Sequence, residues 1–355
     1  MTILWINLAV VFGSSFLARH FASPRSLQDY KKPNMFLIIS SMTTLVLVSG
    51  LRSNIGDTYF YKHAYEVSDF SWEYILSQKD IGFGILQMVL KNYVSEDPQI
   101  LLFITALITN TLIVIVFYNY SRMIELSLYV YITGGLFLVS MNGIRQALAA
   151  AIAFTAIKYL IEGKFLGYFL VIVFASLFHQ SALILLPIYF LVRFQAWSKA
   201  TVALLVLSVV IVIGFEQFTA VLFTALEDTQ YGHYDTFTEG GANFLRVAVT
   251  SVPVIIAYLG REKLKRLFPD SDYIVNMALI GFMFMIISTQ NWIFARFSIY
   301  FELYQLILLS WIVKVFRERD QKLVYFGIIV CYFAYYYFEN VMTLNILYKS
   351  DYLFW

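Results

Sequence analysis

The stretch Ser140-Met141-Asn142-Gly143-Ile144-Arg145-Gln146 separates two apolar segments, residues 127–141 and 144–160. It places an arginine and two amides where a membrane helix usually has leucine. A second polar break, Phe178-His179-Gln180-Ser181, follows the next apolar run. Hydrocarbon cannot solvate ionisable groups, so those that occur inside apolar sequence are rare and usually functional. We therefore expect the two breaks to belong to one site.

The composition around these breaks is that of a membrane protein. The chain has 355 residues, of which 60% are hydrophobic and 14% charged, and its mean hydropathy is +0.72. Helices satisfy their own backbone hydrogen bonds in hydrocarbon, so the sequence predicts an all-α bundle of transmembrane helices. We expect one integral membrane domain over residues 1–355, without room for a separate soluble catalytic domain.

Apolar stretches bounded by polar clusters give twelve candidate membrane segments. Several are short for an upright span, and 127–141 and the pair around His179 are expected to be tilted, broken or re-entrant, so we predict about 10 to 12 spans. The segments are 3–18, 35–50, 100–118, 127–141, 144–160, 165–178, 181–192, 201–215, 244–259, 274–290, 297–313 and 323–338.

The distribution of charge predicts the orientation. The first apolar run has no basic residues before it, which argues against a cleaved signal peptide and places the N-terminus outside. Most of the 25 Lys and Arg residues then fall on inside connections, as the positive-inside rule requires. We expect a multi-pass protein of the bacterial plasma (inner) membrane. The single cysteine, Cys331, allows no intrachain disulfide.

Two outside loops are long, and long loops are often functional. The first, residues 51–99, is expected to contain interfacial helices, because its apolar run 82–90 is too short to span and should lie at the membrane interface. The second covers residues 216–243.

Four arginines lie on the expected outer side, each at the end of an apolar segment, against the positive-inside bias. A guanidinium is always charged and offers a planar fork of donors that fits phosphate. Four of them would suit the diphosphate of a lipid-linked substrate. The structural alternative is that the arginines extend to the membrane surface or pair with Asp57, Glu239 or Glu302. The four are Arg52, Arg145, Arg246 and Arg296.

Two residues are candidates for a general base. Asp57 follows Arg52 by five positions and would activate a sugar hydroxyl if it lay within reach of the proton. The alternative is that Asp57 caps a helix that starts near Thr58. His179 lies level with Arg145 on the outer side and would accept or relay a proton near neutral pH, or serve as a structural hydrogen-bonding group.

Other candidates surround these residues. Arg296 and Tyr300 share a helical face, and Tyr61 would stack on a sugar ring or belong to the interfacial aromatic belt. The histidines lack the spacing of a zinc site, and the sequence has no dense carboxylate cluster. We therefore expect no cofactor, although the sequence does not exclude a bound divalent cation. The sequence has neither a Walker loop nor a glycine-rich dinucleotide turn.

Five pieces of sequence resemble the EpsG family of Wzy-like polymerases, which act in bacterial exopolysaccharide and capsule synthesis. In chain order they are Arg52…Gly56-Asp57…Tyr61, Asp80-Ile81-Gly82-Phe83, Asn142-Gly143-Ile144-Arg145-Gln146, His179-Gln180-Ser181, and Arg296…Tyr300. The glycine-aromatic element has Asp80 where the acidic residue is usually Glu, and the match is weakest beyond Tyr300.

The resemblance implies a multispan enzyme, related to C-type glycosyltransferases, that joins polyprenyl-diphosphate-linked repeat units on the outer leaflet. It implies site roles for Arg52, Asp57, Arg145, Gln146, His179 and Arg296; Arg246 is added from its charge alone. It also implies that a flippase and a chain-length regulator work with the enzyme. No nucleic acid partner is expected.

Two alternatives remain open at this point. A transporter or flippase of lipid-linked oligosaccharides would also need arginines for a diphosphate, but would carry polar residues at mid-bilayer and symmetrical repeats. A membrane acyltransferase would use His179 as the base and would leave the four outer arginines unexplained.

Overall fold

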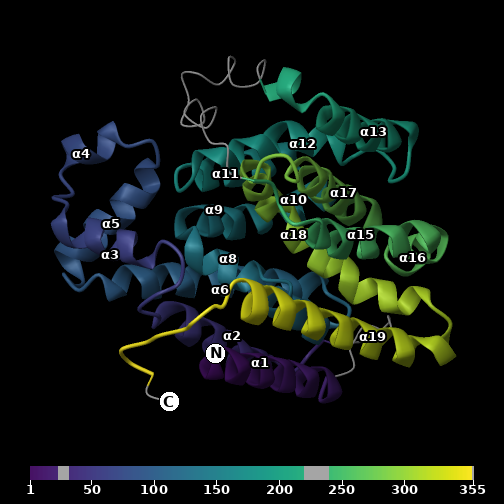
Figure 1. The fold of residues 1–355 in the computed structure, drawn as a ribbon, viewed down its shortest axis with the longest axis horizontal. Helices are drawn as coiled ribbons and strands as arrows, with labels where there is room; N and C mark the ends of the chain where they lie inside the picture. The colour runs from purple at the N-terminus through teal and green to yellow at the C-terminus, as the bar shows by residue number, and fades with distance from the viewer. Residues whose placement is uncertain (23–31, 220–239, 354–355) are drawn as a thin grey trace. The chain divides into compact units, whose positions relative to one another are not determined.

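The computed structural model describes residues 1–22, 32–219 and 240–353 (Figure 1). Within these ranges the regular elements are helices, without a strand, which confirms the all-α fold class. The chain divides into two compact units. Unit 1 consists of Met1–Leu186 and Leu309–Trp355, and unit 2 of Pro187–Leu308. The expectation of a single membrane domain stays a prediction.

All twelve predicted apolar segments are helical. They correspond, in order, to α1 (Thr2–His20), α2 (Met35–Gly50), α6 (Gln99–Tyr120), α7 (Ile124–Thr133) with α8 (Leu136–Asn142), α9 (Ile144–Phe154) with α10 (Ile157–Ile161), α11 (Phe165–Ser176), η1 (Gln180–Ile184) with α12 (Leu185–Leu191), α13 (Lys199–Ile213), α15 (Phe244–Leu259), α17 (Ser271–Ile287), α18 (Ile293–Ile312) and α19 (Glu318–Tyr336).

Short helices connect them. These are α3 (Thr58–Val67), α4 (Trp72–Ser77) and α5 (Ile81–Tyr93) in the first long loop, α16 (Arg261–Leu267), η3 (Val313–Val315) and the π-helical turn η4 (Tyr337–Thr343). The apolar run 82–90 forms most of α5.

Length and apolarity qualify four helices of the described chain as membrane spans, or six if each bent pair counts as one span. The predicted break in 127–141 is present, because α7 and α8 meet at 56°. Gly135 provides this bend with a left-handed φ of +91°, which glycine adopts without steric cost. Five further apolar helices are only 10–17 residues long, so the count of 10 to 12 spans stays a prediction.

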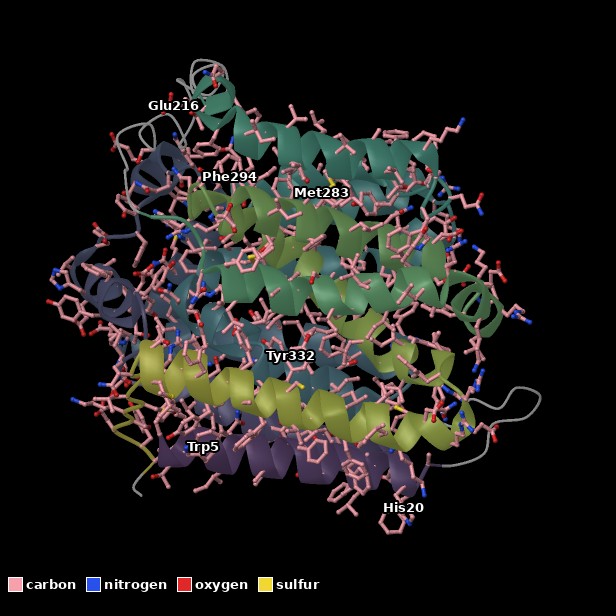
Figure 2. All side chains as sticks on the ribbon, turned by 45° about the vertical axis from the view of Figure 1, so that its right-hand side comes forward. Trp5, His20, Glu216, Met283, Phe294 and Tyr332 are labelled. Carbon is pink, nitrogen blue, oxygen red and sulfur yellow. The ribbon has the colours of Figure 1, made fainter. Side chains whose placement is uncertain are left out.

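Unit 1 is a bundle in which α1 packs on α2 and α7, α2 on α6, α6 on α9, and α9 on α11. Alanines at four of the positions 149–153 let α9 be buried almost completely, since small side chains allow helices to approach closely. Trp5 of α1 packs on Phe333 and Tyr336 at the far end of α19, with ring centroids 5.5 and 5.3 Å apart (Figure 2).

Helices α3, α4 and α5 gather at one end of the long helices of unit 1 (Figure 1). The C-terminal segment returns to the same end, where Ser53 N donates to Lys349 O at 2.9 Å and the Asn54 amide bonds Leu347 and Lys349. Tyr348 Oη also donates to Val48 O at 2.8 Å. These hydrogen bonds from the C-terminal segment therefore stabilise the turn that leads from α2 into α3.

Unit 2 contains α13, α15, α16 and α17 and most of α18, with α17 packed on both α13 and α15. Buried Asn276 donates to Val192 O and Phe194 O and so fixes the chain that leads into α13. Phe294 packs against Phe215 and Phe218. Most of the predicted second outside loop, residues 216–243, lies outside the described residues.

Candidate functional site

A cavity of about 400 Å³ opens at the α3–α5 end of unit 1. Its wall includes three of the charged residues singled out from the sequence, Asp57, Asp80 and Arg145. Aromatic side chains complete it, among them Tyr61, whose ring lies 6.2 Å from that of Phe83. Its size and its mixture of apolar wall and a few charged groups are those of a small-molecule site.

An ion pair joins the first turn of α9 to the start of α5. Arg145 Nη1 lies 2.8 Å from Asp80 Oδ2, and the arginine side chain is 45% exposed whereas that of Asp80 is 6% exposed. Asp80 thus anchors a guanidinium that still faces the cavity. Burial raises the pKa of Asp80 above its ordinary value, and the charge of Arg145 and a hydrogen bond from the Gln180 backbone partly oppose that rise.

Asp80 also joins the two polar breaks of the sequence. Its Oδ1 accepts a hydrogen bond from Gln180 N at 3.2 Å, while its Oδ2 pairs with Arg145. Two residues further along, Gly82 N donates to Leu177 O at 2.8 Å. The start of α9 and the start of η1 therefore meet across the beginning of α5.

Asp57 occupies the N-cap position of α3, yet its carboxylate makes no capping hydrogen bond. Asp57 contacts Asn142 through its backbone instead, where Asp57 N donates a hydrogen bond to Asn142 Oδ1 at 2.9 Å. Gly56 has a φ of +52°, and a Cβ there would overlap the Asn142 side chain. Asp57 lines the cavity, and among the described residues its carboxylate has neither a hydrogen-bond nor an ion-pair partner.

Arg52 is fully buried and contacts protein groups only. Its Nε donates to Thr58 Oγ1 at 3.0 Å, its Nη2 to Met141 O at 2.7 Å, and its Nη1 to Ser49 O. Burial lowers its pKa to about 10. The guanidinium connects the end of α2, the start of α3 and the last turn of α8, which suits a positioning role better than the predicted direct contact with a diphosphate.

His179 caps η1. Its Nδ1 lies 2.8 Å from Ser181 Oγ and accepts from Ser181 N at 3.3 Å. When Nδ1 accepts, the proton of a neutral imidazole is on Nε2, so neither nitrogen is available to take another from a substrate without rearrangement. His179 is connected to Asp80 through Gln180, but it is not in the wall of the cavity.

Three helices start at the cavity: α3 after Asp57, α5 after Asp80, and α9 with Arg145 in its first turn. The N-terminal end of a helix carries a partial positive charge and unpaired N–H groups, which favour anions. Sequence analysis missed this convergence. The signal was present in the aspartates that precede two of the helices, but only the fold brings the helix starts together.

The formal charges of the cavity wall are two carboxylates and one guanidinium. Within the described part of the chain, no group of three or more His, Cys, Asp or Glu side chains is arranged to hold a metal ion. A strongly anionic ligand such as a diphosphate would therefore need positive charge in addition to Arg145 and the helix ends.

The sequence model of the EpsG family matches residues 35–350, nearly the whole chain. The chain belongs to the EpsG family. This family places it among polysaccharide polymerase-type membrane proteins. A search of curated proteins and a search of solved structures find no match.

The remaining predicted residues of this EpsG-family protein lie elsewhere. Gln146 is buried in α9. Three belong to unit 2: Arg296 stacks on Trp292 with Cζ 4.5 Å from the ring centroid, Tyr300 is buried, and Arg246 interacts electrostatically with Glu302. The convergence of all four arginines stays a prediction, and the interaction with Glu302 is one of the alternatives expected for an outer arginine.

Proposed function

We propose that this EpsG-family protein is a glycosyltransferase that joins polyprenyl-diphosphate-linked repeat units at the outer face of the plasma membrane. The growing glycan would be transferred from its polyprenyl diphosphate to a hydroxyl of an incoming repeat unit. The diphosphate already activates the donor, so the reaction needs no nucleotide sugar. Family membership supports polysaccharide polymerisation; the lipid-linked substrate is our proposal.

The observation that carries this proposal is the Arg145–Asp80 pair at the start of α9. Asp80 fixes the guanidinium, whose side chain is 45% exposed in the cavity wall. Such a preorganised cation at a helix N-terminus would stabilise the negative charge that develops on the diphosphate as its bond to the sugar breaks. A guanidinium also presents a fork of donors that fits two phosphate oxygens.

Asp57 would act as the general base. Its carboxylate would take the proton of the acceptor hydroxyl, the acceptor oxygen would bond to the anomeric carbon of the donor, and the electrons of the broken bond would leave with the diphosphate. Asp57 is favoured over His179 because it lines the cavity, whereas Nδ1 of His179 is engaged with Ser181. Tyr61 would pack against a sugar ring from the same wall.

The cavity wall carries two negative charges and one positive charge, so binding of a diphosphate needs further positive charge. The negative charges are those of Asp57 and Asp80, and the positive charge is that of Arg145. The predicted substrate residues Arg246 and Arg296 would be one source, and a divalent cation would be the other. Chelation by EDTA distinguishes them, because only the second requires a metal for activity.

The test is chain elongation by the purified full-length protein in proteoliposomes with a defined lipid-linked repeat unit. We expect a ladder of longer glycans, and an Arg145→Lys variant that elongates about 10- to 100-fold more slowly because lysine keeps the charge but lacks the fork. Glycans of unchanged length that appear in the opposite leaflet would instead identify a flippase. Full activity of Arg145→Lys would remove Arg145 from diphosphate binding.

A further inference from the structure

A second hollow in unit 1 differs chemically from the charged cavity. It is a groove of about 660 Å³ formed by α5, α6, α9 and α11 and lined almost entirely by apolar side chains. None of its lining residues is charged. Several are exposed on the surface of the bundle, among them Val89, Leu170 and Phe174, so the groove opens to the surroundings of these apolar helices.

The groove and the charged cavity lie on two sides of the same helix start. On α5, Phe83 and Gly84 line the cavity, whereas Gly82, Ile85 and Val89 line the groove. Helix α11 approaches closely here, because Gly82 N donates to Leu177 O and a Cβ on Gly82 would meet the Leu177 side chain. Helix α5 therefore lies between the two hollows.

Helix α9 also lines both hollows, the charged cavity with its first turn and the apolar groove with the following turns. Arg145 lines the charged cavity, and Leu148, Ile152 and Thr155, which follow on the same helical face at spacings of three and four, line the groove. Ten residues of helix cover about 15 Å, roughly half the hydrocarbon thickness of a bilayer. One face of α9 therefore presents a cation at its outer end and a strip of apolar surface beneath it.

A ligand that matches both hollows has an anionic head and a long apolar chain. We propose that the groove holds the isoprenoid chain of the lipid-linked substrate while its diphosphate lies at Arg145, an inference that rests on the proposed polymerase function. A cavity of about 150 Å³ holds one benzene, so the groove has space for roughly 25 carbons, or about five isoprene units. The remainder of a longer chain would extend into the bilayer.

The experiment uses a polyprenyl diphosphate without sugar that carries a photoreactive diazirine in its isoprenoid chain. The full-length protein in lipid nanodiscs is irradiated with this probe, and the labelled peptides are identified by mass spectrometry. We expect labels within residues 82–89, 148–155 and 170–178. Excess unlabelled polyprenyl diphosphate should abolish the labelling, and the same excess of phosphatidylglycerol should not.

Two leucines of α11 provide a matched pair of variants. Leu170 and Leu166 are 58% and 69% exposed, but only Leu170 lines the groove. Leu170→Trp should fill the groove and lower labelling about tenfold, whereas Leu166→Trp should label like the wild type. Val89→Trp fills the groove from α5 and replaces Leu170→Trp if that variant does not elute as a monodisperse protein.

Two results would overturn the proposal: equal competition by phosphatidylglycerol, which identifies an ordinary lipid site, or equal labelling of the Leu170→Trp and Leu166→Trp proteins. Labelling requires no turnover, so the two proposals fail separately. Groove labelling without any glycan ladder would refute the polymerase alone, and a ladder without groove labelling would refute the groove alone.

Discussion

At the scale of single residues, the four arginines that look equivalent in the sequence have different environments. Arg145 is half-exposed in a cavity wall, Arg52 is buried among backbone oxygens, and Arg296 stacks on Trp292. Sequence reasoning singled out Asp57 by its spacing from Arg52, Arg145 by its place in a polar break and Asp80 by the family resemblance, but it did not predict that the three line one cavity. It had no means to distinguish a buried arginine from an exposed one, since both follow an apolar segment in the same way.

The raised pKa of Asp80 predicts how the stability of the folded protein depends on pH. Burial raises its pKa in the folded protein, so the folded state holds the proton more tightly than the unfolded state. The stability that this proton contributes is complete below the unfolded pKa and is lost as the pH rises through the folded pKa. At neutral pH the ionised carboxylate is thus a cost, and Asp80→Asn should leave the melting temperature equal or higher.

The same substitution should lower activity, because Arg145 loses its anchor and a misplaced group costs up to about 100-fold in rate. In the wild type, elongation should fall as the pH decreases through the raised pKa of Asp80, at a higher pH than for an ordinary aspartate. The Asn variant should lack this acid limb. Melting curves and pH–rate profiles check the two effects; a large loss of melting temperature, or an unchanged acid limb, would contradict the role given to Asp80.

At the scale of elements, apolar patterning predicted the helices well, because a helix that faces lipid or a packed bundle must be apolar along its length. The sequence predicted interfacial helices in the loop 51–99 but not that there are three of them, because their short segments carry mixed polarity. Nor did it show that α3, α5 and α9 start at one cavity. That convergence depends on contacts between residues far apart in the chain, such as Gly82 with Leu177 and Asp57 with Asn142.

Two glycines of α5 test the contact between α5 and α11. A Cβ on Gly82 would lie 2.8 Å from Leu177 Cβ, too close without a shift of the helices, whereas a Cβ on Gly84 would lie 3.4 Å from the nearest Ile75 atom. Gly82→Ala should destabilise the protein by about 1–3 kcal/mol and reduce elongation, because Asp80 moves with α5.

Gly84→Ala is the matched control for stability and should be tolerated in thermal unfolding, since alanine also favours the helix. Thermal unfolding in detergent and elongation in proteoliposomes give the comparison. Equal behaviour of the two alanine variants would show that the close approach at Gly82 does not position the site.

At the scale of the whole molecule, the N-terminus and the C-terminal segment lie at the same end of unit 1 as the site. Within unit 1, Arg52, which follows α2, donates to Met141 O in the last turn of α8, just before Arg145. The C-terminal segment bonds the turn at Ser53 and Asn54. Because α1 and α2 are joined at their opposite ends, where Asn34 N bonds Ala18 O, the N-terminus lies at the same end as the site. An N-terminus outside the cell would therefore place the site outside, as the charge bias predicts.

The number of spans and the assignment of Arg246 and Arg296 to the site stay predictions for a physical reason. Short apolar helices are compatible with tilted spans, broken spans and buried core helices alike, and charge at a helix end does not say which other helix it approaches. The polymerase proposal therefore stands on the charged cavity of unit 1.

Chain elongation by Asp57→Asn tests this cavity, with Asp69→Asn as its control. Asp69 is an exposed carboxylate of the same loop that does not line the cavity, so the control removes the same charge at a similar place in the chain. In proteoliposomes with a defined lipid-linked repeat unit, Asp57→Asn should elongate at least about 100-fold more slowly, while the photoreactive polyprenyl diphosphate still labels it. Elongation by Asp57→Asn at the rate of Asp69→Asn would show that the cavity is not where the glycosidic bond forms.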